Sequence, residues 1–153
     1  MDVTKSCRAL LAATDDSPEA RHALGCALHL ARDLGAKLYA LYVIDSHAAR
    51  SLGVHRQEGI REMAAEGKEA IQSLLRQAEE LGVEAEGLLA EGRPGEEICR
   101  LAKHCRADIV VIGVKGKSLI EEALLGDVSR HVLHHAKQPV LVVRGEGHGQ
   151  YGV

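Results

Sequence analysis

The feature that most constrains the fold of this chain is a strict alternation of short apolar runs with longer segments of helical periodicity. The apolar runs predict five strands, at residues 9–13, 37–44, 83–90, 108–114 and 139–144. The periodic segments predict helices at residues 18–35, 56–82, 93–105 and 127–136. Alternation of this kind is typical of a parallel sheet between two layers of helices. We therefore expect one doubly wound α/β sheet of five parallel strands in the order 3-2-1-4-5, with helices on both faces.

The ends of the first predicted helix are marked by residue types that favour helix termini. Ser17 suits the N-cap position, Pro18 suits the first helical position, and Gly35 stops the helix. Residues 45–55, which precede the long helix, are interpreted as a loop. The fourth apolar run favours a strand buried on both faces, whereas the weaker third run predicts a strand near an edge of the sheet.

Composition and charge limit the classes of partner. The chain has 153 residues, and we expect residues 1–144 to form one domain, followed by a flexible glycine-rich tail at residues 145–153. Phe and Trp are absent, so the core must be built from Leu, Ile, Val and Ala, without an aromatic platform for single-stranded nucleic acid. The formal net charge of −3 gives no general attraction to DNA or to anionic membranes. We therefore expect no nucleic-acid partner and no membrane partner.

Cysteine usage and the first residues of the chain favour a cytoplasmic protein. The N-terminus is too polar for a signal peptide, and no apolar run reaches the length of a membrane span. The four cysteines form no Cys-x-x-Cys pair, so we expect reduced thiols.

Glycines near the C-terminus are arranged like those of a phosphate-binding loop. Gly113 and Gly116 would let the backbone approach a ligand that a Cβ would block. Gly126 opens the last predicted helix, where free N–H groups and the helix dipole favour an anion. No Gly-x-x-x-x-Gly-Lys-Ser/Thr occurs, so this is not a P-loop. In the expected strand order, Asp15 after the first strand and Gly113 after the fourth would face one crevice.

Asp127 places a negative charge beside the expected phosphate position. One interpretation, which we favour, is a helix N-cap, for which Asp is among the best residues. The other is a ligand for a metal ion that bridges to phosphate, because hard cations prefer oxygen. An unbridged carboxylate about 4 Å from a phosphate charge would cost roughly 4 kcal/mol at an effective dielectric constant of about 20. Lys115 and Lys117 could offset part of this cost.

Together these segments resemble the universal stress protein family over residues 5–144. The matching segments are Ala12–Ala20, Tyr42–Asp45, the pattern Gly113-x-x-Gly116-x9-Gly126-x-Val128-Ser129, and Pro139–Val143. Nucleotide-binding members of the family hold ATP in the crevice described above. The resemblance therefore implies ATP or another adenine nucleotide as cofactor, with Mg²⁺ or Mn²⁺ as a candidate companion ion. It also implies a homodimer that pairs through the last strand, residues 139–144.

The resemblance assigns roles to nine residues. Asp15 is expected at the ribose or adenine end, two strand residues in the base pocket, and three glycines at the phosphates. The expected nucleotide-binding residues are Ala13, Asp15, Val43, Gly113, Gly116, Gly126, Asp127, Val128 and Ser129. The family pattern has Ser or Thr where this chain has Asp127. A competing hypothesis is therefore a dimeric interaction module of the same fold that has lost ATP binding.

No residue pattern predicts a catalytic or a metal centre. His22, Cys26, His29 and Asp33 share one side of the first helix at a spacing that could hold a metal, but we favour a solvated polar stripe. No serine has a motif-linked histidine base. We expect a stress-response sensor or modulator rather than an enzyme, with at most slow ATP hydrolysis. A genuine phosphatase or ATPase is the third hypothesis.

Overall fold

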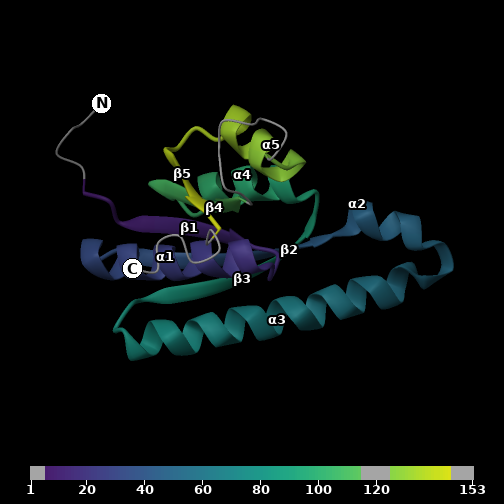
Figure 1. Ribbon diagram of the computed structural model, residues 1–153, viewed down its shortest axis with the longest axis horizontal. Coiled ribbons are helices and arrows are strands. Elements are labelled where there is room, and N and C mark those ends of the chain that lie inside the picture. The colour runs from purple at the N-terminus through teal and green to yellow at the C-terminus, as the bar shows by residue number, and fades with distance from the viewer. Residues whose placement is uncertain (1–5, 115–124, 146–153) are drawn as a thin grey trace.

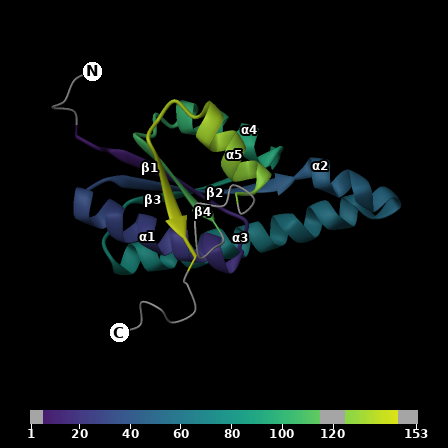
Figure 2. The ribbon, with the colours of Figure 1, turned by 45° about the horizontal axis from the view of Figure 1, so that its top comes forward.

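Five parallel strands form a single sheet in the computed structural model, which describes residues 6–114 and 125–145 (Figure 1). The strands are β1 Ala9–Thr14, β2 Lys37–Asp45, β3 Ala85–Gly92, β4 Ile109–Val114 and β5 Val140–Arg144. They lie in the order β3-β2-β1-β4-β5, and every neighbouring pair is parallel. The predicted doubly wound fold and its strand order are therefore confirmed. β3 lies at one edge, as its weak pattern indicated, and β5 forms the other edge (Figure 2).

Helices cover both faces of this sheet. The helices of the described residues are α1 Pro18–Leu34, α2 Ser46–Ala49, the 3₁₀ helix η1 Arg50–His55, α3 Arg56–Glu80, α4 Pro94–His104 and α5 Asp127–His135. α1 and α3 pack on one face, and α4 and α5 pack on the other (Figure 1). Because both faces are covered, the central strands β1 and β4 are mostly buried, in agreement with their apolar sequences.

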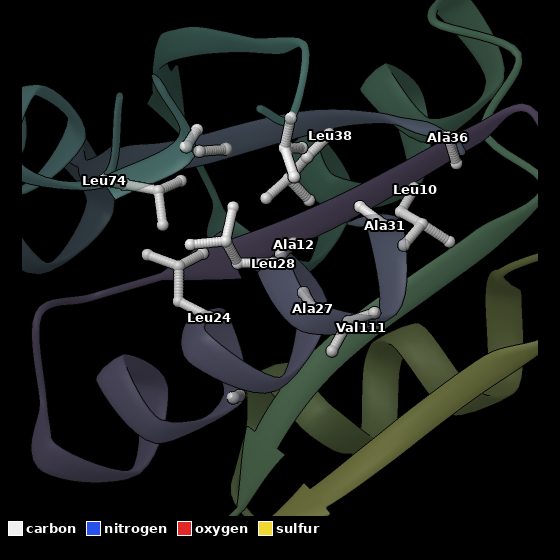
Figure 3. Packing of buried hydrophobic residues seen from close by; sticks show 14 residues of the cluster. Leu10, Ala12, Leu24, Ala27, Leu28, Ala31, Ala36, Leu38, Leu74 and Val111 are labelled. Carbon is white, nitrogen blue, oxygen red and sulfur yellow. The ribbon is translucent and has the colours of Figure 1, made fainter. Parts of the chain in front are cut away.

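Aliphatic side chains build the core. Figure 3 shows the cluster beneath α1, where Leu10, Leu28, Leu38 and Val111 meet. α1 presents alanines such as Ala27 to the sheet, and these short side chains let the helix lie close to the strands. Burying a leucine side chain fully stabilises the fold by roughly 1.5–3 kcal/mol. The expected core of Leu, Ile, Val and Ala is therefore found within the described residues.

α1 begins and ends where the sequence predicted. Ser17 Oγ accepts a hydrogen bond from the Ala20 N–H at 3.2 Å, and Pro18 is the first helical residue. Gly35 adopts a left-handed conformation, with φ 64° and ψ 30°, and its N–H bonds to carbonyls of the last turn. The two caps fix the connections of α1 to β1 and to β2.

The interpretation of residues 45–55 as a loop is wrong. α2, η1 and the first turns of α3 form an arm (residues 46–61) that projects beyond the end of the sheet (Figure 1). Asp45 Oδ1 caps α2 by accepting a hydrogen bond from the Ala48 N–H at 2.9 Å, and Leu52 packs against Gly59 of α3. Helices this short depend on single caps and contacts, so they leave no periodic pattern in the sequence.

Three strands begin later than predicted, and β4 differs by one residue, starting at Ile109 rather than Asp108. β3 starts at Ala85 rather than Val83, because the Val83 N–H closes the end of α3 by donating to the Ala78 carbonyl at 2.8 Å. β5 starts at Val140 rather than Pro139, since proline has no N–H to donate to a ladder. These differences shift strand ends without changing the sheet.

The predicted C-terminal tail falls mainly outside the described residues. Gly145 is described, and its N–H donates to the Val114 carbonyl at 2.8 Å, whereas residues 146–153 are not described. The division of the chain at residue 144 stays a prediction. None of the described helices combines the length and the apolar character needed to cross a bilayer.

Candidate functional site

A crevice of about 530 Å³ opens at the carboxyl ends of β1 and β4, where the progression of the chain through the sheet reverses. Its volume falls within the range of about 300–1,000 Å³ found for small-molecule sites. Eight predicted residues line it: Ala13, Asp15, Val43, Gly113, Gly126, Asp127, Val128 and Ser129. The ninth, Gly116, lies outside the described residues. The fold thus brings together side chains from the β1–α1 loop, β2, β4 and the start of α5.

The loop after β1 is held by hydrogen bonds to its own side chains. The Asp16 N–H donates to Thr14 Oγ1 at 3.0 Å, and the Ser17 N–H donates to Asp15 Oδ1 at 2.9 Å. Asp16 has a left-handed φ of 63°, which Asp tolerates better than most residues, and Arg21 pairs with its carboxylate at 3.0 Å. These contacts hold the exposed carboxylate of Asp15 at the mouth of the crevice.

The apolar part of the crevice lies between β2 and α4. Ala13 and Val43 are partly buried there and belong to the same hydrophobic cluster as Ile98 of α4. Tyr42 also lines the crevice, and its hydroxyl donates to Glu66 Oε2 of α3 at 2.9 Å. Burial and then the hydrogen bond to Glu66 raise the pKa of Tyr42 well above its ordinary value, so the hydroxyl stays protonated at neutral pH. Such an apolar slot accepts a planar ring.

Sequence reasoning missed several residues of the crevice wall. They include Glu19, Tyr42, Met63, Pro94 and Ile98. These side chains come from α1, β2, α3 and α4, and tertiary packing alone brings them together. Among these residues, only Pro94 could have been predicted from the sequence. Proline favours the first position of a helix, and a helix that starts directly after a parallel strand has its N-terminus at the carboxyl edge of the sheet, where the crevice lies.

Gly113 has a packing role in addition to its place in the crevice. A Cβ at this position would lie 2.6 Å from the Glu19 carbonyl oxygen in the first turn of α1, and 3.1 Å from the Ala23 Cβ. The absence of a side chain therefore lets α1 approach β4. Gly126 differs, because no atom of the described residues beyond its chain neighbours lies within 4 Å of its Cβ position. Of these two glycines, Gly126 is the one that leaves open space.

The interpretation of Asp127 as the N-cap of α5 is wrong. Gly126 is the N-cap, with an extended backbone at φ −70° and ψ 168°, and its carbonyl accepts the Arg130 N–H at 3.0 Å. Asp127 is the first residue of the helix, and its exposed carboxylate interacts favourably with the N-terminal end of the helix dipole. Gly126 has no side chain to cap the helix, and the N–H groups at the start of a helix favour an anionic ligand.

The described wall of the crevice is acidic. Its charged residues are Asp15, Glu19, Asp45 and Asp127, and the described part contains no lysine or arginine. Lys115 and Lys117 lie outside the described residues. The carboxylate oxygens suit Mg²⁺ or Mn²⁺, which would bring positive charge to the site.

Among residues 6–114 and 125–145, no group of three or more His, Cys, Asp or Glu side chains is arranged to hold a metal ion. In the polar stripe on α1, Cys26 Sγ lies 3.9 Å from His22 Nε2. Ser129 is buried at the start of α5, and the described crevice wall includes no histidine.

Comparisons with known proteins agree with this geometry. The model of the Universal stress protein family matches residues 7–144. The universal stress protein MJ0531 of Methanocaldococcus jannaschii is 37% identical over 133 residues, which cover 86% of this chain and 78% of that protein.

Solved structures show the same fold. Universal stress protein UspA from Lactobacillus plantarum is similar with a TM-score of 0.80 and 26% identity, covering 92% of this chain and 100% of that one. The universal stress protein from Archaeoglobus fulgidus in complex with dAMP has a TM-score of 0.65 and 25% identity, covering 90% and 97% of the two chains.

Proposed function

This chain belongs to the universal stress protein family, and we propose that it binds an adenine nucleotide, ATP in the first place, as a sensor or modulator in a stress response. The observation that carries this proposal is the crevice at the carboxyl ends of β1 and β4, where a carboxylate, an apolar slot and a helix N-terminus line one cavity. The dAMP complex of the Archaeoglobus fulgidus relative supports the adenine nucleotide as ligand class.

In this proposal each part of the nucleotide meets matching chemistry. The apolar slot at Ala13 and Val43 receives the base, and the exposed carboxylate of Asp15 accepts hydrogen bonds from the ribose hydroxyls. The phosphates lie toward Gly126 and Ser129, where the first N–H groups of α5 favour an anion. Gly116 would contribute from the segment between β4 and α5.

The acidic wall makes the phosphate contact depend on a divalent cation. Asp127 repels an uncompensated triphosphate and competes for the N-terminal end of the α5 dipole. With Mg²⁺ or Mn²⁺ present, the same carboxylate becomes an oxygen ligand and its charge becomes favourable. We therefore expect tight ATP binding only with a divalent cation, and at most slow hydrolysis.

The second partner in the proposal is another copy of this chain, bound through β5. This strand occupies an edge of the sheet, and Leu141 on it is 41% exposed. An apolar edge strand with free N–H and C=O groups favours pairing with a second strand of the same kind.

A cytoplasmic location fits the four cysteines, all of which are free thiols.

One observation favours the competing function, a dimeric interaction module that has lost nucleotide binding: the described crevice wall has four acidic residues and no lysine or arginine. Extraction of the purified protein, followed by chromatography of the released small molecules, separates the two. The nucleotide-binding proposal expects co-purified adenine nucleotide, or stoichiometric uptake of ATP in Mg²⁺. Absence of both would support the interaction module.

A further inference from the structure

Independently of the nucleotide crevice, we propose that the arm (residues 46–61) docks onto a second copy of this chain. In this contact the tip of each arm, Arg50–Arg56, enters a groove at the base of the other arm. The contact does not use β5 and shares only Met63 with the described wall of the crevice, so charge changes at other residues test it separately from the function proposed above.

The groove lies between the arm and α3 and has a volume of about 720 Å³. Its floor is apolar and consists of Ala48, Ala49, Leu52 and Met63. Its lining also carries four carboxylates, from Asp16, Glu62, Glu66 and Glu69, and the described lining has no lysine or arginine. Asp16 already pairs with Arg21, and Glu66 accepts the Tyr42 hydroxyl, so the exposed Glu62 and Glu69 are the rim residues that the contact uses. A ligand for this groove should therefore combine an apolar centre with positive charge around it.

The tip of the arm has this complementary chemistry. Val54 is 95% exposed, and Gly53 turns the backbone just before it with a φ of 57°. Arg50, which is exposed, and Arg56, which is half-buried with its Nε enclosed, flank the valine, and residues 50–56 contain no acidic side chain. The nearest carboxylate in sequence is Glu58, which pairs with His55 at 3.3 Å. A single exposed valine is ordinary on a protein surface. Here it stands between two arginines at the end of a projecting arm, which matches the groove in both polarity and charge.

The spacing of tip and groove permits a closed two-fold contact. Arg56, the tip residue that begins α3, lies seven residues before Met63 of the groove, which is roughly 10 Å along the helix axis. When two arms lie antiparallel about a two-fold axis, each tip therefore comes over the groove of the other copy, and the same contact forms twice. The arm contact by itself therefore closes after two copies.

Charge complementarity favours the antiparallel arrangement of two copies over the parallel one. In the antiparallel arrangement Arg50 and Arg56 face the rim residues Glu62 and Glu69, whereas a parallel arrangement would bring equal charges together. The net charge of the chain is −3, so whole-molecule electrostatics oppose self-association, and this local pairing must supply the attraction.

Two reciprocal charge reversals test the contact. The tip variant is Arg50→Glu/Arg56→Glu, and the groove variant is Glu62→Lys/Glu69→Lys. Each variant alone places equal charges at both copies of the contact, so its self-association should weaken about ten-fold or more and lose its salt dependence. An equimolar mixture can form a pair that contains one copy of each variant. In this pair the acidic tip of the tip variant meets the basic groove of the groove variant, and the native tip of the groove variant meets the native groove of the tip variant. Association should then return to the wild-type level.

Sedimentation velocity over a micromolar concentration series reads out the mass, while circular dichroism checks the fold and calorimetry checks ATP binding. The β5 edge is identical in all proteins, so pairing through β5 cannot produce the reciprocal pattern. Loss in each variant and recovery in the mixture would establish the contact. Unchanged self-association of either variant, no recovery in the mixture, or a wild-type monomer would each overturn it, and a monomer would leave the groove to a basic segment of another protein.

Discussion

Replacing Gly113 with alanine should destabilise the protein, whereas replacing Gly25 with alanine should stabilise it. The new Cβ at Gly113 would lie 2.6 Å from the Glu19 carbonyl oxygen, a backbone atom that moves only if the first turn of α1 moves. Gly25 lies inside α1, and no atom beyond its own helix lies within 4 Å of its Cβ position. The two substitutions are chemically the same and differ in their surroundings.

The structure predicts opposite signs of comparable size for the two variants. Overpacking a tight contact costs about 1–3 kcal/mol. Alanine in place of glycine inside a helix gains about 0.5–1 kcal/mol, because the unfolded chain loses conformational freedom. In a chain of this size about 1 kcal/mol changes the melting temperature by roughly 2–4 °C, so the two variants should differ by several degrees.

Urea unfolding followed by circular dichroism measures both changes. We expect a lower midpoint for Gly113→Ala and a higher one for Gly25→Ala, with the slope of the transition unchanged. A Gly113→Ala protein as stable as the wild type would refute the packing role of this glycine. Because Glu19 lines the crevice, the destabilised variant should also bind ATP more weakly.

Three further substitutions test separate parts of the account. Asp127→Ser should tighten ATP binding in EDTA by about ten-fold and change it less in saturating Mg²⁺, and equal affinities in EDTA would rule out the electrostatic argument. Tyr42→Phe removes the hydrogen bond to Glu66 and should cost about 1 kcal/mol at neutral pH. Folding raises the pKa of Tyr42, so the stabilisation that its hydroxyl gives to the folded state is fully present below the ordinary pKa of 10.0 and is lost as the pH rises above that value. The free energy of unfolding should therefore fall less steeply with alkaline pH in Tyr42→Phe than in the wild type. Leu141→Lys places charge on the exposed edge of β5 and should lower the mass seen by light scattering, whereas an unchanged mass would argue against pairing through β5.

Local signals in the sequence were sufficient for the sheet and for its best-defined helix. The alternation of apolar runs with periodic segments predicted a doubly wound parallel sheet, and Ser17 and Gly35 predicted the ends of α1 because caps act within one turn. The arm was missed since its short helices depend on contacts such as that of Leu52 with Gly59, which link separate segments.

The crevice shows the same division between local and tertiary information. Asp15 and Gly126 follow or begin regular elements, so the expected topology placed them at one edge of the sheet. Met63 and Ile98 reach the crevice from the sides of α3 and α4, and no local pattern indicates this. The cap of α5 falls one residue before the predicted one, because glycine at position 126 already takes the extended conformation that a cap needs.

Calorimetric titration of ATP with Mg²⁺ into the wild type and into Asp15→Ala tests the central claim most directly. Asp15 is exposed at the mouth of the crevice, so its removal costs the loop hydrogen bond from the Ser17 N–H but should leave the overall fold intact, as circular dichroism would verify. Loss of a charged hydrogen-bond acceptor for the ribose costs about 1.5–3 kcal/mol, which corresponds to roughly ten- to hundred-fold weaker binding. We predict stoichiometric binding by the wild type and a loss of this size in the variant. No binding by the wild type, or equal affinity in a folded Asp15→Ala protein, would contradict an adenine-nucleotide site in this crevice.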